Sequence, residues 1–183
     1  MKPVINNYRR ISRTSRLFIR LLQALMVLVP LVDAAIWISL NEKLWAPIRM
    51  QFLPKYVTQP LPGLTRMAGF GVSLLPLSLF LFANTTLIRL FRLYQRGIIF
   101  SAENVHCFRL LSRALMGWCL VGILTDPLMS LALTLHHPAG KHMLSVGLGS
   151  FDLTALLIGG ILAVITWVMD EARKLKEEQD FTI

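Results

Sequence analysis

The chain has 183 residues, of which 55% are hydrophobic and 16% are charged, and its formal net charge is +9. Soluble domains carry about 25% charged residues, so this composition excludes an ordinary soluble domain and indicates a membrane protein. The basic residues flank apolar stretches and form no basic domain of their own, which argues against nucleic-acid binding. At this length we expect one domain, residues 1–183.

Four apolar stretches are long enough to cross a bilayer as helices. They cover approximately residues 17–40, 67–88, 110–135 and 151–169. About 20 mostly apolar residues span the hydrocarbon, and backbone groups in lipid must be satisfied within their own segment. The sequence therefore predicts an all-α, polytopic membrane protein with four transmembrane helices in two hairpins.

The first stretch also has features of a cleaved signal peptide. Residues 17–29 resemble a signal's apolar region, and Val32-Asp33-Ala34 loosely fits a cleavage site. The apolar run continues through Ile38, which favours a retained helix. The basic segment before it, residues 2–16, is expected either to lie along a membrane surface or to form a frayed tail.

The basic residues predict an orientation. Fourteen of the 19 Lys and Arg lie before the apolar core of the first helix, between the cores of the second and third helices, or after the fourth helix. The positive-inside rule then places both termini and the inner loop, residues 89–109, in the cytoplasm. The outer loops are residues 41–66 and 136–150. The first of them is rich in proline and is expected to form a lid on the membrane face or a surface that docks a partner.

Three carboxylates within or beside the apolar stretches are the strongest pointer to a site: Asp33, Asp126 and Asp152. A charged group at a helix centre costs about 2.5 kcal/mol or more, so such residues usually face a bundle interior, a cavity or a partner. All three belong to the outer half of the membrane, and Pro30 and Pro127 free carbonyls near two of them. They are expected to form an oxygen-rich cavity for a cation or a proton. The alternatives are hydrogen bonds between helices and, for Asp152, a helix cap.

The inner loop contains residues that favour the end of one helix, followed by residues that favour the beginning of the next. Gly97 is a good C-terminal cap, Ser101 a natural N-cap, and Glu103 suits the first turn of a helix that begins near Ala102. The second helix is expected to continue through Gln95, and the last helix to extend into the tail, residues 170–183. Helices two to four thus extend into the cytoplasm.

Two motifs carry a family resemblance. They are Tyr94-Gln95-Arg96-Gly97-Ile98-Ile99-Phe100-Ser101-Ala102-Glu103-Asn104-Val105 and Leu175-Lys176-Glu177-Glu178-Gln179-Asp180-Phe181-Thr182-Ile183. From the second helix onward the chain resembles bacterial inner-membrane proteins of domain-of-unknown-function family 2975. The resemblance implies a four-helix bundle in the bacterial inner membrane. Some members look like regulatory partners of small helix-turn-helix proteins, and comparable small polytopic proteins act as immunity proteins.

The two motifs carry opposite charges on the same predicted side. Arg92, Arg96 and Arg109 flank the inner loop, whereas Glu177, Glu178 and Asp180 lie in the tail. We hypothesise that the tail folds back onto the loop, with Phe181 and Ile183 packed against Ile98 and Phe100. A solvated tail is the alternative, because isolated exposed ion pairs contribute only about 0–1 kcal/mol.

The remaining patterns predict packing rather than chemistry. Ala155, Gly159 and Ala163 form a small-residue stripe that suits helix packing within the protein or, alternatively, a homodimer face. Cys107 and Cys119 are expected to be free thiols. The histidines at 136, 137 and 142 indicate an exposed loop rather than a metal site with Asp152. We expect neither a metal nor a cofactor.

No enzyme signature occurs in the sequence, so we expect a non-enzymatic protein. The favoured function is protein binding in or at the membrane, either immunity against a membrane-acting toxin or regulation of a partner. The alternative is a small cation- or proton-conducting or coupling protein that uses Asp33 and Asp126. Besides the bilayer, we expect a protein partner and no nucleic acid.

Overall fold

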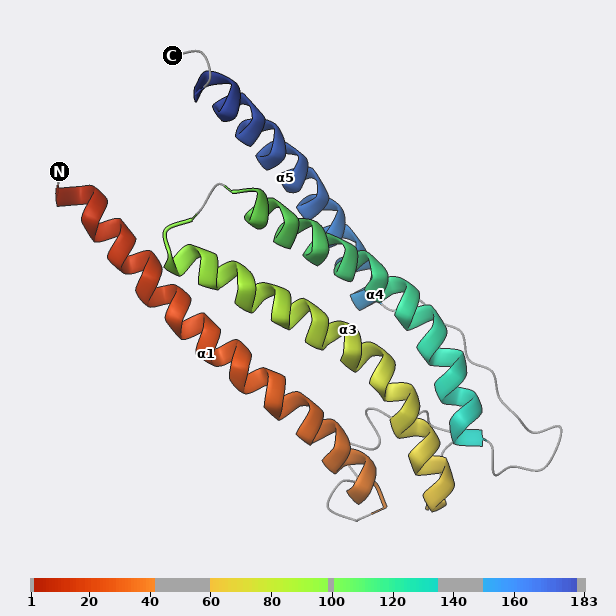
Figure 1. Ribbon diagram of the computed structural model, residues 1–183. Helices are drawn as coiled ribbons and strands as arrows, with labels where there is room; N and C mark the ends of the chain where they lie inside the picture. Colours follow the sequence, from red (N-terminus) through yellow and green to blue (C-terminus); the bar gives the residue numbers. More distant parts are fainter. Residues whose placement is uncertain (1, 42–59, 99–100, 135–149, 181–183) are drawn as a thin grey trace.

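The protein is all-α in the residues that its computed structural model describes, which are 2–41, 60–98, 101–134 and 150–180. Four helices account for nearly all of them (Figure 1): α1 (Lys2–Ser39), α3 (Gly63–Gln95), α4 (Ala102–Thr134) and α5 (Ser150–Asp180). Each helix contains a stretch long and apolar enough to cross a membrane. The prediction of four membrane helices is confirmed, and the protein is a multi-pass membrane protein.

The helices are longer than the apolar stretches that predicted them. A helix of 33 residues, such as α3 or α4, is about 50 Å long, whereas the hydrocarbon core is about 30 Å thick. The expected continuation of α3 through Gln95 and the expected start of α4 at Ala102 are both confirmed. The expectation of a frayed tail at the N-terminus was wrong, because the backbone is helical from Lys2 and runs without a break into the apolar part of α1.

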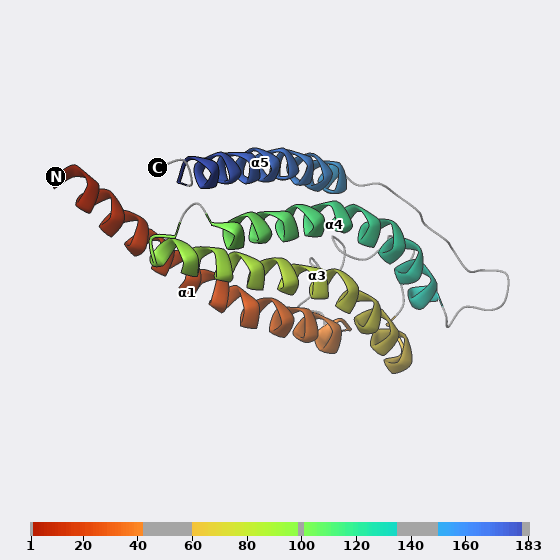
Figure 2. The same cartoon turned by 45° about the horizontal axis from the view of Figure 1, so that its top comes forward.

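The four helices lie side by side in chain order (Figures 1 and 2). α1 packs along α3, α3 along α4, and α4 along α5, and no other pair of described helices shares an extended contact. α1 approaches α4 only at one end, where Leu133 joins Trp37 and Leu40 in an apolar cluster. The expected four-helix bundle is therefore an open row, because its two edge helices, α1 and α5, do not pack on each other.

Three apolar clusters hold the row together. Ile19, Leu22 and Ile88 join α1 to α3. Leu90, Leu93, Cys107 and Leu111 join α3 to α4. The third cluster lies at the opposite end from the two termini and consists of Trp37, Leu40, Leu61 and Leu133. Burial of such side chains contributes to helix association mainly through close packing when the surroundings are lipid.

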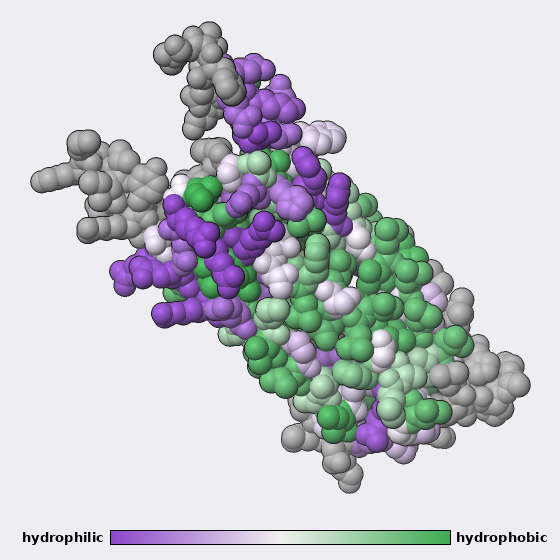
Figure 3. Space-filling view, viewed as in Figure 1, coloured by the Kyte–Doolittle hydropathy of each residue, from purple (hydrophilic) through white to green (hydrophobic). Residues whose placement is uncertain are grey.

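The face of the row seen in Figure 3 is apolar along most of its length. Trp167 on α5 is 71% exposed and Leu17 on α1 is 63% exposed, values that suit contact with lipid tails rather than water. The hydrophilic surface gathers at the end that carries both chain termini, which we call the termini end. The other end is called the distal end.

Candidate functional site

Asp33 lies in the seam between α1 and α3 and has a hydrogen-bond partner. The Ser73 hydroxyl lies 2.9 Å from Oδ2 of Asp33 and 2.8 Å from the carbonyl oxygen of Phe70. The Asp33 side chain is half-buried. A carboxylate that accepts a hydrogen bond across two helices is less costly in an apolar environment than an unpaired one. The geometry therefore gives Asp33 a role in joining α1 to α3.

The rest of the α1–α3 seam at the distal end is also tied by polar contacts. The Asn41 side chain donates to the Leu61 carbonyl at 2.9 Å and accepts from the Leu61 amide at 3.0 Å. Arg66 donates from Nη1 to the Ile38 carbonyl at 2.8 Å. The Arg66 bond satisfies a carbonyl that the end of α1 leaves without a helical partner, and the Asn41 bonds pair the backbone of Leu61, two residues before α3. Together they fix the end of α1 against the start of α3.

Asp126 and Asp152 lie together on the neighbouring pair of helices, α4 and α5. The carboxylate of Asp152 on α5 lies against Gly122 of α4. A methyl group added at Gly122 would lie 2.9 Å from Oδ1 of Asp152. Asp126 is one helical turn further along α4, and the two carboxylates interact electrostatically. Gly122 thus provides the space in which the carboxylate of α5 approaches that of α4.

The three aspartates do not form one site. Asp33 belongs to the α1–α3 seam, whereas Asp126 and Asp152 belong to α4 and α5, and α1 has no extended contact with either of those helices. The expected cavity shared by all three carboxylates is therefore divided into two separate places. Trp37 of α1 packs on Gly69 of α3.

Asp126 differs from the other two aspartates in its exposure. Its side chain is exposed, although it lies eight residues inside the end of α4, about 12 Å along the helix from that end. In the described part of the chain no side chain forms a hydrogen bond or an ion pair with it. Pro127 has no N–H and cannot bond the carbonyl of Ile123, which lies three residues before Asp126. This surface is consequently rich in acceptors and poor in donors.

The turn between α3 and α4 has the predicted caps. Gly97 has a φ of 75°, a conformation that favours glycine. The Ile98 amide bonds the Leu93 carbonyl and the Gly97 amide bonds the Tyr94 carbonyl, both at 3.1 Å, which is the Schellman pattern. Ser101 caps α4 as predicted, because its hydroxyl accepts a 3.3 Å bond from the Asn104 amide.

Asn104 links the two ends of this turn. Its side chain is 0% exposed, and Nδ2 donates to the Ile98 carbonyl at 2.9 Å. Its Oδ1 atom is also buried. Glu103 is in the first turn of α4, as predicted. Phe100 lies outside the described residues. The motif thus shapes the α3–α4 connection, and its Asn104 is a structural residue of that connection.

The charged tail continues α5 as a helix. The hypothesis that the tail folds back is wrong for residues 170–180, because α5 runs unbroken to Asp180 and packs on α4 rather than on α3. Glu178 belongs to this helical segment, and Phe181 and Ile183 lie outside the described residues. The contact with α4 is made by Asp170, whose carboxylate lies 4.0 Å from Arg109 and 3.2 Å from Arg173.

The small-residue stripe of α5 faces α4. Ala155 is 5% exposed, and Gly159 meets the side chains of Leu115 and Met116. The Ser112 hydroxyl donates to the Gly159 carbonyl at 2.8 Å, which requires a close approach of the two helices. Ala163, one turn further, is half-buried. This placement corresponds to packing within the chain rather than to a homodimer face.

A family model described as "Protein of unknown function (DUF2975)" matches residues 18–183. The chain belongs to this family. The match begins in α1, so the family relationship extends over more of the chain than the two motifs indicated. Neither a curated protein nor a solved structure matches the chain.

Within this member of family 2975, both cysteines are free thiols, as predicted. No group of three potential metal ligands occurs among the described residues. The three loop histidines lie outside them.

Among the described residues, five polar contacts between helices were missed in the sequence: those of Arg66, Ser73, Asn84, Ser112 and Asp170. Asn84 is 2% exposed and donates to the Leu22 carbonyl of α1 at 2.9 Å. An amide within an apolar stretch is itself a signal for such a bond. The serines carry no comparable signal, because a serine in a membrane helix usually bonds its own backbone, as Ser78 does with the Leu75 carbonyl.

Proposed function

We propose that this protein is a non-enzymatic membrane protein that binds another integral membrane protein beside Asp126. The single observation that supports this function is the exposed carboxylate of Asp126 within the apolar helix α4, about 12 Å along the helix from its end. A carboxylate that faces lipid costs about 2.5–3.5 kcal/mol on insertion scales. A partner that supplies a donor would remove part of this cost.

The chemistry of the surface defines the partner. Asp126 and the Ile123 carbonyl are acceptors on one side of α4, and Asp152 adds a second carboxylate from α5. A matching transmembrane helix would present Lys, Arg or a hydroxyl or amide donor at the same depth. Such pairs between membrane helices contribute about 0.6 kcal/mol on average and up to about 1.7 kcal/mol.

The open row supports a binding role. Because α1 and α5 each pack on one neighbour, the row leaves both of its faces accessible to another protein within the membrane. The distribution of Lys and Arg supports an orientation with the termini end in the cytoplasm, and the family resemblance supports the bacterial inner membrane as the location. Asp126 would then lie in the periplasmic half of the bilayer.

We propose two classes of partner for this surface. One is a toxin that inserts into the inner membrane from outside, which the protein would neutralise; the other is a membrane protein that it regulates. Genes next to this one distinguish them: a secreted toxin supports immunity, and a helix-turn-helix protein supports regulation.

Site-specific photo-cross-linking in native membranes tests the binding surface. A photoreactive residue at Ile123, three positions before Asp126 and on the same side of α4, is expected to form an adduct of one defined mass. Leu124 is the matched control, since it lies at the same depth, is 59% exposed and points to roughly the opposite side of the helix.

The Ile123 adduct should disappear when Asp126→Leu is added. Equal adducts from both positions, or lipid adducts alone, would contradict the proposal. An adduct of twice the mass of the chain would identify the partner as a second copy.

The alternative function is cation or proton coupling. It is favoured by the proximity of Asp126 and Asp152, since two neighbouring carboxylates readily share a proton or a cation. In this alternative Asp152 replaces Asp33 as the partner of Asp126. Ion flux into proteoliposomes that falls in Asp126→Asn, with unchanged folding, would support coupling. Absent flux in the wild-type protein would exclude it.

A further inference from the structure

We propose that the arginine-lined pocket between α1 and α3 at the termini end binds the phosphate of an anionic phospholipid. The pocket has a volume of about 820 Å³, and its walls include Ser12, Arg13, Arg16, Tyr94, Gln95 and Arg96. It lies towards the opposite end of the molecule from Asp126, so the inference is independent of the proposed function.

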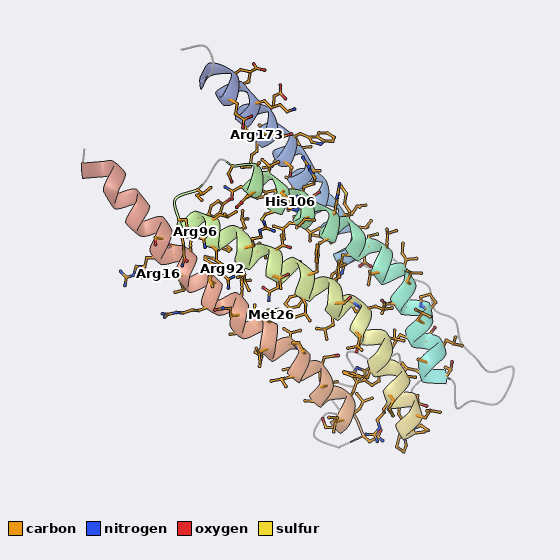
Figure 4. All side chains as sticks on the ribbon, viewed as in Figure 1. Arg16, Met26, Arg92, Arg96, His106 and Arg173 are labelled. Atoms are coloured by element: carbon orange, nitrogen blue, oxygen red, sulfur yellow. The ribbon has the colours of Figure 1, made fainter. Side chains whose placement is uncertain are left out.

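The positive charge of the pocket comes from two helices. Arg13 and Arg16 belong to the first part of α1, and Arg96 caps the end of α3. Arg16 and Arg96, together with Arg92, lie at the same end of the two neighbouring helices in Figure 4. Arginines that serve only to orient a protein must lie on the same side of the membrane, but they need not lie close to one another. Arg13, Arg16 and Arg96 also line a single hollow.

No carboxylate neutralises this charge within the described residues. The ion pairs of Arg109, Arg173 and Lys174 lie on α4 and α5, and among described side chains none involves an arginine of the pocket. Three guanidinium groups around one pocket repel each other, and an anion between them would relieve that repulsion. Arginine suits phosphate because its planar fork can donate two hydrogen bonds to phosphate oxygens.

Backbone hydrogen bonds at the end of α3 also make this position less unfavourable for an anion. The C-terminal carbonyls of a helix carry partial negative charge, which would oppose a phosphate. Here the carbonyls of Arg92, Leu93 and Tyr94 accept bonds from the amides of residues 96–98. The local negative potential is thereby reduced at the side of the pocket that Arg96 forms.

The depth of the pocket identifies the phosphate as that of a lipid. Further along the same seam, Phe18 and Phe91 stack with ring centroids 5.1 Å apart, and the apolar cluster of Ile19, Leu22 and Ile88 follows. The pocket therefore borders the apolar part of the same seam. A headgroup phosphate lies at this level, and its acyl chains would run along exposed residues such as Leu17 and Leu21.

Lipid retention by the purified protein tests the site. The protein in detergent is mixed with phosphatidylglycerol or phosphatidylcholine and analysed by native mass spectrometry. We expect preferential retention of phosphatidylglycerol, and a loss of about tenfold in the variant Arg16→Gln/Arg96→Gln. The control Arg113→Gln/Lys174→Gln removes two exposed charges at the same end on α4 and α5, and should retain the lipid as the wild type does.

Two further measurements keep the test decisive. If the glutamine variant aggregates, Arg16→Lys/Arg96→Lys keeps the charge but loses the bidentate geometry, and it should still retain less phosphatidylglycerol than the wild type. Glycerol 3-phosphate, which has no acyl chains, should not compete at the same concentration. Equal retention of both lipids, unchanged retention in the pocket variants, or full competition by glycerol 3-phosphate would overturn the proposal.

Discussion

The indole ring of Trp37 on α1 lies on the backbone of Gly69 on α3, so closely that a methyl group at position 69 would overlap the ring. Trp37 is 9% exposed and belongs to the cluster that joins α1, α3 and α4 at the distal end. The absence of a side chain at Gly69 is what allows this large ring to lie between the helices.

Gly69→Ala should destabilise the protein because the Trp37 ring must move. Overpacking of this kind costs about 1–3 kcal/mol, which thermal unfolding in detergent would report as a lower Tm. Gly71→Ala is the control, since no atom lies near the position of its added methyl group. The control should be neutral or gain up to about 1 kcal/mol from helix propensity. Equal effects at both positions would contradict the packing argument.

Ser73→Ala should weaken the contact between α1 and α3 because Asp33 loses its donor. The expected loss of unfolding free energy is about 0.6 kcal/mol and at most about 1.7 kcal/mol, the range for hydrogen bonds between membrane helices. Ser78→Ala removes a hydroxyl that bonds only its own helix and should change the unfolding free energy less. The reverse order of the two effects would exclude Asp33 as a contact residue.

Asn104→Asp should destabilise the α3–α4 turn. The substitution removes the donor to the Ile98 carbonyl and places a carboxylate in a position that is 0% exposed. Loss of a buried hydrogen-bond partner costs about 1–3 kcal/mol, and a buried charge adds to it. Limited proteolysis of the turn and a lower Tm would report the effect. His106→Asn, at an exposed position two residues further, should leave both unchanged.

Asp126→Leu should leave the stability of the isolated protein almost unchanged. The side chain is exposed and has no partner in the described part of the chain, so a change within about 0.5 kcal/mol is expected. Thermal unfolding of the detergent-solubilised variant measures this directly. A large loss of stability would show that the carboxylate is a structural residue, and the partner surface proposed at Asp126 would then have to be abandoned.

Local signals in the sequence were sufficient for the helices and for the inner-loop caps. Gly97 and Ser101 act through their own backbone geometry and their own side-chain oxygen, and therefore their roles are visible in a few adjacent residues. The extension of α1 back to Lys2 was left open, because three apolar residues among the charges, Ile5, Tyr8 and Ile11, fit a helix but are too few to predict one in a short basic segment. The tail was predicted to be helical, and residues 170–180 are, whereas the contacts proposed for Phe181 and Ile183 lie outside the described residues.

The sequence by itself determined that this protein has four membrane helices and where two of them end and begin, since length, hydropathy and capping are properties of adjacent residues. Only the tertiary structure decided which helices are neighbours. Packing in lipid depends on small residues and on single polar contacts, such as Gly69 beneath Trp37 and Ser73 beside Asp33, which one sequence does not pair. The row therefore separates Asp33 from Asp126 and brings Asp126 together with Asp152.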